Sequence, residues 1–338
     1  MERAFAGDER AIAACARARL DVERVASTSA VTRMYAEYPV KLLAPKAHVM
    51  PGSDCAWAYS VSCGGGLVSG DASGTTIRVA DGCALALATQ GTQKVYKHNK
   101  RRFGEFDDKD TGSGRGGGVG ETVAALHATV GDGALLAVLP DPTQIFARAV
   151  FRQTQAIELS ATGSCVCVDW LTAGRVAHGN ERWAFDEASL RTRVSVDGEP
   201  AVIESQRLRA STREPMINDD RTLSQRMGAV NVLATVIILG PRVQALAKTA
   251  VAWARERARA SMLVEGASWI HQPASLKRED DRFFVSASEI TPADSPSSGA
   301  VLRFFAQDSE TVYEALRVVL APLAADLGAP PYAERGAA

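Results

Sequence analysis

A chain of 338 residues with 46% hydrophobic residues is long enough to bury one large core or two smaller ones. Its formal net charge of -1 provides no basic stripe for DNA or RNA, so we expect no nucleic acid partner. The best candidate for a membrane-spanning run, residues 230–239, has about half the length needed to cross a bilayer, so no membrane association of this kind is expected.

The first thirty residues combine alanine and arginine with four acidic residues, and they lack an uninterrupted apolar core. Neither a secretory signal nor an organellar transit peptide is therefore expected. The six cysteines are scattered and include no CxxC pair, so nothing indicates an oxidising compartment. We expect a cytoplasmic protein in which residues 1–30 form an N-terminal extension, with disorder as one interpretation, and residues 31–338 form a single domain.

After this extension, the first two thirds of the chain read as short β-rich segments that Gly, Asp or Pro turns separate. Asp81-Gly82, Gly131-Asp132-Gly133 and Asp197-Gly198 each lie between two such segments, where the turn of a hairpin belongs. Strands do not alternate with helices here, so a mostly β fold is predicted. The predicted strands are residues 56–61, 75–79, 83–89, 123–130, 134–139, 156–159, 164–170 and 191–196.

Helical periodicity begins only in the C-terminal third. Residues 241–262 carry apolar side chains at spacings of three and four, with arginines near the end, where cations stabilise the helix dipole. A second helix is predicted over residues 309–327, with Ser309 as a candidate N-cap and Gly328 as the stop. Pro322 lies inside it, so a kink or break is expected near Ala321.

Residues 101–120 interrupt the β pattern with charge and glycine, and we interpret them as a Gly-rich, disordered insert. They contain a literal GxGxxG, but an acidic run precedes it where a dinucleotide site requires a buried strand. A near match to a phosphate-binding loop has Glu121 in place of the lysine. We therefore expect no nucleotide site in this chain.

The segment CGGGLVSGD, residues 63–71, opens a glycine-rich turn onto a single carboxylate, Asp71. Strand-like residues follow it, whereas a phosphate-binding loop would need a helix there. Glycine allows positive φ angles and close approach of two backbones, so these glycines could let two strands cross and present Asp71 at the crossing. The alternative is that Asp71 is solvated or caps the turn, which is the usual role of a turn carboxylate.

The sequence contains no signature of catalysis. The serine elbow GxSxG, the zinc motif HExxH and paired-cysteine zinc motifs are absent, and the five histidines are isolated. Cys165 and Cys167 share one face of a predicted strand, where packing is their expected role.

Five segments together carry a resemblance to a known family. They are YAEYPVKLLAP at residues 35–45, the glycine segment at 63–71, TQGTQKVY at 89–96, LPDPTQIFA at 139–147 and DWLTAGRVAHG at 169–179. In this order and at these intervals, the sequence resembles the UreD (UreH) family of urease accessory proteins. The resemblance covers residues 33–210, and the C-terminal third matches only in its coarse plan.

The resemblance implies an elongated, mostly β body that is solenoid-like (β-helix-like), with two α-helices in the C-terminal third. It also implies a non-enzymatic accessory protein, a metallochaperone that bridges urease subunits to a complex of UreF and the GTPase UreG during urease maturation. Nickel would be bound transiently, with no tightly bound cofactor, and passed toward the urease active site.

For nickel transfer through an internal passage, the resemblance points to Asp71 and Glu181. Glu181 is one position later than the family glutamate, because Asn180 follows the glycine, and a slip of one residue on a strand turns a side chain to the opposite face. The adjacent His178 is a candidate for an additional ligand, because nickel(II) accepts imidazole as well as carboxylate. An ordinary surface histidine is the alternative.

The remaining residues of the five segments are expected to have structural roles. Arg175 is expected to pair with Asp169 or Asp71 inside the β body, since a buried guanidinium without a partner is too costly. The signature residues are Gly65, Gly66, Gly70, Gly91, Lys94, Tyr96, Asp169, Trp170, Gly174 and Arg175.

A hydrolase on a β scaffold is the alternative function, with Asp71 and Glu181 as an acid/base pair. It predicts a closed pocket and a strongly raised pKa for one of these carboxyl groups. The accessory protein predicts instead an open-ended passage lined by polar groups.

Overall fold

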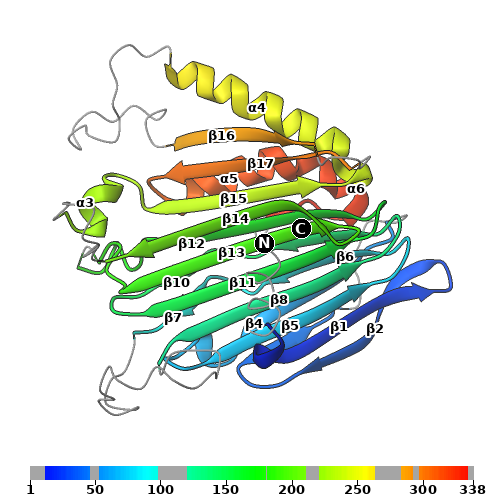
Figure 1. Cartoon of the computed structure of the whole chain (residues 1–338), viewed down its shortest axis with the longest axis horizontal. Helices are drawn as coiled ribbons and strands as arrows, with labels where there is room; N and C mark the ends of the chain where they lie inside the picture. Colours follow the sequence, from blue (N-terminus) through cyan, green and yellow to red (C-terminus); the bar gives the residue numbers. More distant parts are fainter. Residues whose placement is uncertain are drawn as a thin grey trace.

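Two β-sheets make up most of the molecule (Figure 1). The computed structural model describes residues 12–45, 53–97, 120–179, 181–210, 221–262, 283–291 and 297–333. The 7-stranded sheet, called sheet A, contains in spatial order β14 (Glu199–Arg209), β13 (Glu187–Val196), β11 (Val150–Leu159), β8 (Thr122–Val130), β5 (Ala72–Val79), β1 (Ala16–Val25) and β2 (Thr28–Ala36).

The 10-stranded sheet, called sheet B, packs against sheet A. Its main path is β16 (Phe283–Ile290), β17 (Gly299–Ala306), β15 (Val232–Leu239), β12 (Ser164–Thr172), β9 (Leu135–Leu139), β6 (Ala84–Thr89), β4 (Ala56–Ser62) and β3 (Val40–Leu43). Two short strands lie beside this path, since β10 (Thr143–Ile145) pairs with both β12 and β7 (Gln93–Val95).

Between β4 and β13 the chain crosses repeatedly from one sheet to the other. The strands β5, β8, β11 and β13 pair in parallel in sheet A, and β4, β6, β9 and β12 do so in sheet B. Of the three hairpin turns predicted from sequence, only Asp197-Gly198 joins antiparallel neighbours, β13 and β14. The turns at Gly82 and Gly133 instead connect strands of different sheets, β5 to β6 and β8 to β9. The parallel partner of each of these strands comes only after the chain has crossed to the other sheet and back.

The mostly β fold is confirmed, but the strands form two mixed sheets and not the solenoid-like body predicted. Antiparallel neighbours extend both parallel stacks: β2 and β14 in sheet A, and β3, β15, β17 and β16 in sheet B. This pairing interrupts the repeating crossover that a solenoid requires.

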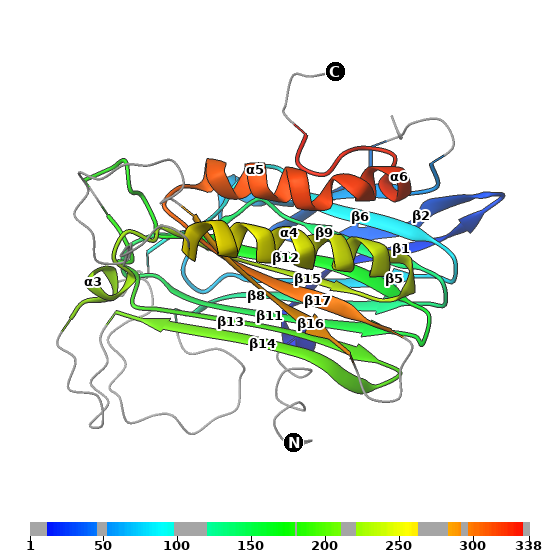
Figure 2. The ribbon, with the colours of Figure 1, turned by 90° about the horizontal axis from the view of Figure 1, so that it is seen from above.

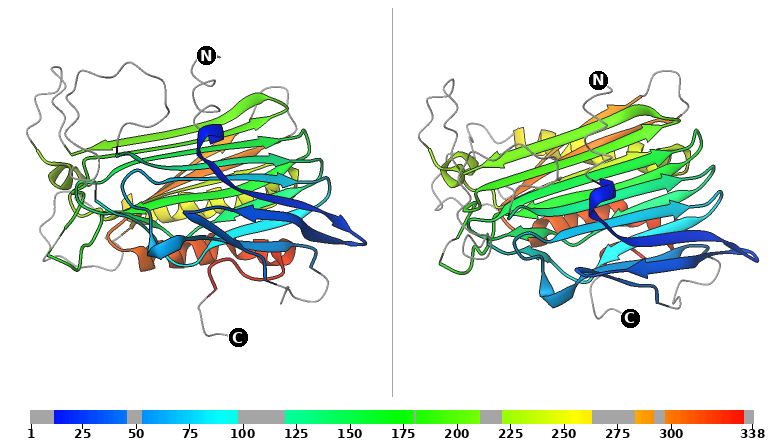
Figure 3. Two further views of the ribbon diagram at one scale, coloured as in Figure 1. Left: turned by 90° about the horizontal axis from the view of Figure 1, so that it is seen from below. Right: turned by 60° about the horizontal axis from the view of Figure 1, so that its bottom comes forward.

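The N-terminal region joins the sheet earlier than expected. Within the region 1–30, predicted as an extension, β1 pairs in parallel with β5 and continues into β2 as a hairpin (Figure 3). Leu20 and Val22 of β1 are fully buried. Residues 16–30 are therefore part of the folded body, whereas residues 101–119 of the predicted insert lie outside the described residues.

Helices cover the outer face of sheet B as a third layer (Figure 2), and the prediction of two C-terminal helices is confirmed. α4 (Gln244–Met262) has 19 residues and α5 (Ser309–Leu320) has 12. Leu246 of α4 and Leu316 of α5 are buried in one cluster with Val236 of β15 and Phe304 of β17. Two shorter helices are α3 (Leu223–Met227) and α6 (Ala324–Leu327).

The ends of these helices differ slightly from the prediction. A 3-10 turn (Pro241–Val243) precedes α4. Asp308, and not Ser309, is the N-cap of α5, because its carboxylate accepts the N–H of Thr311 at 2.9 Å. The expected break near Ala321 is present as a 3-10 turn (Ala321–Leu323). Within the described ranges, no helix is long and apolar enough to cross a membrane.

Candidate functional site

Four of the five signature segments meet at one end of the sheets. β7 pairs in parallel with β10, and β10 pairs with the end of β12 at Leu171 and Thr172. The glycine segment joins this group through Leu67, whose N–H donates to the carbonyl oxygen of Lys94 at 2.8 Å. Tyr96 returns a hydrogen bond to the carbonyl oxygen of Leu67 at 2.9 Å. These four segments therefore form one continuous piece of structure.

Gly66 allows this close approach. A Cβ atom at this position would lie 2.5 Å from the carbonyl oxygen of Lys94 and 2.8 Å from the ring of Tyr96. The predicted role of glycine in bringing two backbones together is confirmed here. Tyr96 in turn packs its ring against Phe146 of the LPDPTQIFA segment, with the ring centroids 5.2 Å apart, while the Lys94 side chain is exposed.

Asp71 closes the turn that these glycines open. Its carboxylate accepts the N–H of Val68 at 2.9 Å, and its own N–H donates to the carbonyl oxygen of Val68 at 3.0 Å. The residue is half-buried. These are the contacts of a turn cap, the alternative role that the sequence left open. Asp71 does not line either of the two cavities described below.

Glu181 is bound to Arg175 and to the backbone. Its carboxylate accepts the N–H of Ala147 at 2.8 Å and two hydrogen bonds from Arg175, from Nε at 3.2 Å and from Nη2. The Arg175 guanidinium lowers the pKa of Glu181, and it lies 4.9 Å from the centroid of the Phe146 ring. The prediction that Arg175 pairs with Asp169 or Asp71 is wrong, because Glu181 is much nearer in the same turn.

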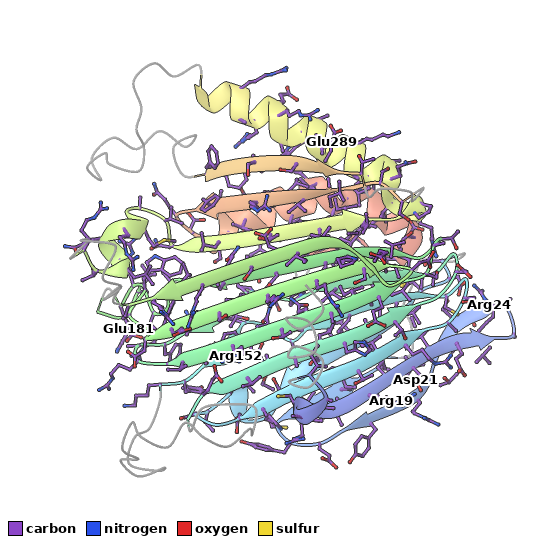
Figure 4. All side chains as sticks on the ribbon, in the orientation of Figure 1. Arg19, Asp21, Arg24, Arg152, Glu181 and Glu289 are labelled. Carbon is purple, nitrogen blue, oxygen red and sulfur yellow. The ribbon has the colours of Figure 1, made fainter. Side chains whose placement is uncertain are left out.

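His178 is exposed, and its positive form is near enough to Glu181 to contribute to the lowered pKa of that carboxyl. The two residues lie in the turn before β13, whereas Asp71 lies before β5, and Glu181 is at the end of the molecule next to α3 (Figure 4). The starts of β13 and β5 are three strand spacings apart, about 14 Å. The structure therefore brings Glu181 and His178 together but places Asp71 elsewhere. The lowered pKa of Glu181 shows that this carboxyl is not the raised-pKa acid of the hydrolase alternative, and its separation from Asp71 leaves the two carboxyl groups without the shared pocket that an acid/base pair needs.

Gly91 has its backbone N–H bonded to a carboxylate that sequence reasoning did not identify. Asp141 accepts this N–H at 2.7 Å, and its other carboxylate oxygen accepts the hydroxyl of Tyr313 on α5 at 2.7 Å. The backbone N–H of Asp141 also donates to the hydroxyl oxygen of Thr89 at 2.7 Å. The TQGTQKVY segment is thus bonded to the LPDPTQIFA segment and to the helical layer.

A band of polar side chains divides the apolar core between the two sheets. On β11, the inward-facing residues run from Phe151 through Gln153 and Gln155 to Ile157, so two amides separate two apolar clusters. The other strands repeat this order at the same level, with Asp169 between Cys167 and Leu171 on β12. We call this band the polar layer; it comprises Ser60, Ser62, Ser73, Thr75, Thr89, Gln153, Gln155, Asp169, Thr192, Glu204, Gln206 and Thr235.

Two adjoining cavities follow the polar layer. The larger has a volume of about 120 Å³, enough for several water molecules, and reaches the half-buried Ser62 and Gln93 beside β4 and β7. The smaller has a volume of about 10 Å³, room for about one water molecule. Its lining combines polar side chains, Thr192, Glu204, Gln206 and Thr235, with apolar ones such as Leu190, Leu233 and Ile237. Asp169 and Trp170 line both cavities. The two cavities therefore adjoin at Asp169, and polar side chains occur along both of them between the sheets.

Asp169 is the charged group at the junction of the cavities. Gln153 donates to its Oδ1 at 2.8 Å, and Thr192 donates to its Oδ2 at 3.5 Å. Burial raises the pKa of Asp169 to about 6, although hydrogen bonds from Gln153, Gln155 and Thr192 act in the opposite direction. The negative charge of Glu204 raises this pKa further. By surface area Asp169 is only half-buried, because it borders open volume deep between the sheets.

Sequence reasoning placed Asp169 among structural residues and missed the rest of the layer. A usable signal was present: Thr192 and Thr235 each lie between apolar same-face neighbours of their strands, and Gln153 and Gln155 together lie between Phe151 and Ile157. Only the pairing of strands far apart in sequence shows that these positions lie at one level. Among the described residues, no group of three or more His, Cys, Asp or Glu side chains could hold a metal ion. The polar layer offers mainly neutral hydroxyl and amide ligands beside its carboxylates.

Comparison with known proteins gives a consistent result. A model of the UreD urease accessory protein family matches residues 14–338. Urease accessory protein D of Oryza sativa subsp. japonica is 33% identical over 337 residues, covering 98% of this chain and 99% of that protein. Urease accessory protein D of Arabidopsis thaliana is 30% identical over 316 residues, covering 92% and 98%. Urease accessory protein UreD of Anaeromyxobacter sp. (strain Fw109-5) is 38% identical over 230 residues, covering 68% and 67%.

The pKa of Asp169 predicts how stability changes with pH. Because the folded state disfavours the carboxylate, the wild-type free energy of unfolding falls as the pH rises through the range from 3.8 to about 6. The shift corresponds to about 3 kcal/mol at most. Asp169→Asn removes this penalty, so its free energy of unfolding relative to wild type should rise by up to about 3 kcal/mol between pH 4 and pH 8.

Denaturant titrations of both proteins at the two pH values measure this difference. Glu314→Gln, which removes an exposed carboxyl group on α5, controls for the loss of one negative charge. A difference between Asp169→Asn and wild type that is the same at pH 4 and pH 8 would contradict the raised pKa.

Proposed function

Because this chain belongs to the UreD family of urease accessory proteins, whose members are not enzymes, we propose that it acts in urease maturation as a scaffold and nickel metallochaperone. In this proposal it bridges the urease subunits to UreF and the GTPase UreG. Nickel enters the polar layer between the sheets and passes along it toward the urease active site.

The observation that supports a passage is the position of the polar layer. It crosses the space where two facing sheets would ordinarily form one apolar core. The side chains of the layer hydrogen-bond to one another, as Gln153 does to Asp169 and Gln206 to Thr235. The net gain from such a hydrogen bond is only about 1 kcal/mol, and apolar side chains of similar volume at buried polar positions often give equal or greater stability. Function is therefore the better explanation of the layer.

The ligands of the layer suit an ion that must leave again. Nickel(II) accepts carboxylate, and a path of neutral hydroxyl and amide oxygens allows it to move between weak contacts. Passage requires binding that is favourable enough for entry and weak enough for exit. Asp169, at the junction of the cavities, supplies the negative charge that compensates the cation inside the protein.

Asp71, Glu181 and His178 have a separate place in this proposal. They lie outside the linings of the two cavities and near the starts of β5 and β13. We assign them to brief contact with the ion outside the polar layer. Glu181 is held by Arg175 and Ala147, so an ion must compete with these partners for it.

Asp169→Asn tests the passage directly. The amide keeps the size of the side chain and an acceptor for Gln153 but removes the charge. When the variant is co-expressed with UreF, UreG and the urease subunits, we expect urease activity to fall at least about tenfold. A tenfold loss corresponds to a barrier to nickel passage that is higher by about 1.4 kcal/mol. Co-purification of the four components should be unchanged. Glu314→Gln is the matched control, and full urease activity with Asp169→Asn would contradict the passage.

Two substitutions of Asp71 separate a turn cap from an ion contact. Asp71→Asn keeps a side-chain oxygen that can accept the N–H of Val68, whereas Asp71→Ala removes it. If Asp71 contacts nickel, both variants should lower urease activation with assembly preserved. Activity that is normal in Asp71→Asn and lost only in Asp71→Ala would assign Asp71 to the turn alone. Urease activity and nickel content of the co-purified urease are the measurements.

A further inference from the structure

The polar layer ends at an ion pair that joins the two sheets. Arg303 on β17 of sheet B donates from Nε to Oε1 of Glu204 on β14 of sheet A at 3.0 Å. Its Nη2 also donates to Oε2 of the same carboxylate. Glu204 lines the smaller cavity together with Asp169. The two-point contact of guanidinium and carboxylate therefore lies where the layer reaches the edge of the sheets.

The exposure of the two side chains differs in a way that suits a movable contact. The Arg303 side chain is 34% exposed and the Glu204 side chain is 16% exposed. Arginine can carry its charged head into solvent while its stem stays packed. Release of Arg303 therefore places its own charge in water and leaves Glu204 facing the smaller cavity without its partner.

A second contact lies next to the ion pair and also joins the sheets. Gln206, two residues along β14 from Glu204, donates from Nε2 to Oγ1 of Thr235 on β15 at 3.3 Å. Both contacts link inward-facing residues of β14 to sheet B. Apolar side chains also line the smaller cavity, but two polar contacts border it on the β14 side. A passing ion can exchange polar contacts of this kind for its own.

We propose that the Glu204–Arg303 ion pair is the gate of the polar layer at this end, and that Arg303 controls how fast nickel leaves it. This inference rests on the proposed function. With the pair closed, the guanidinium occupies the Glu204 oxygens and repels a divalent cation at Asp169. With the pair open, Glu204 becomes the next carboxylate ligand beyond Asp169, and the ion can move to the edge of the sheets.

Release kinetics test the gate. The full-length chain, purified with the partners it is co-expressed with, is loaded with Ni²⁺ and mixed with excess chromogenic chelator, and the rate of nickel capture is recorded. Arg303→Met keeps an apolar stem and removes the charge, so it should bind the same amount of nickel and release it at least tenfold faster. Arg303→Lys, which keeps a positive charge, should release nickel at a rate closer to wild type.

The controls separate the gate from the passage. Arg255→Met breaks an exposed pair with Glu289 and should leave the rate unchanged. The double variant Arg303→Met/Glu204→Gln leaves no unpaired carboxylate, so it carries the test if Arg303→Met alone fails to fold. It lacks the closing guanidinium but offers the ion a neutral amide oxygen in place of the carboxylate, so it should release nickel faster than wild type and more slowly than Arg303→Met. Normal loading with an unchanged release rate in these Arg303→Met variants overturns the gate alone. Loading that Asp169→Asn does not reduce overturns the proposed passage, and the gate with it.

Discussion

The structure depends on a constraint that two packed sheets normally avoid, the burial of a polar layer with a carboxylate at its centre. Burial raises the pKa of Asp169 to about 6, so its carboxylate is costlier than that of an ordinary aspartate but still predominates at neutral pH. Around it, apolar clusters on both sides carry the stability of the sandwich. Because the layer separates these clusters, the two sheets are held together at both ends while the middle stays polar and incompletely filled.

The DWLTAGR segment connects this layer to the helices. Successive residues of a strand point to opposite faces, so Asp169 faces the polar layer while Trp170 packs toward the third layer. Trp170 donates from Nε1 to the carbonyl oxygen of Pro140 at 2.8 Å, and its ring lies 4.7 Å from that of Tyr313 on α5. Two adjacent signature residues thus tie the candidate passage to the surface that α5 covers, which gives both residues a physical role.

Local patterns predicted the mostly β chain, both long helices and the close approach at Gly66, because turn residues, periodicity and the absence of a Cβ act over a few positions. They did not predict the partner of Arg175, which is the nearby Glu181 and not a carboxylate of the β body. Nor did they predict which polar strand residues meet. Gln153 and Asp169 face each other only because sheet A packs on sheet B, and that packing depends on strands distant in sequence.

The same limit explains why the sequence indicates Asp71 as the carboxylate of the passage, whereas the structure indicates Asp169. A turn carboxylate after glycines is visible in the sequence, whereas a carboxylate at the junction of two cavities is defined only by tertiary structure.

The most direct measurement of whether nickel enters the polar layer is anomalous diffraction at the nickel absorption edge from crystals of the protein soaked with Ni²⁺. The account predicts an anomalous peak within coordination distance of the Asp169 carboxylate, between the sheets. A peak found only beside Asp71 or at Glu181 and His178, with none in the polar layer, would contradict it.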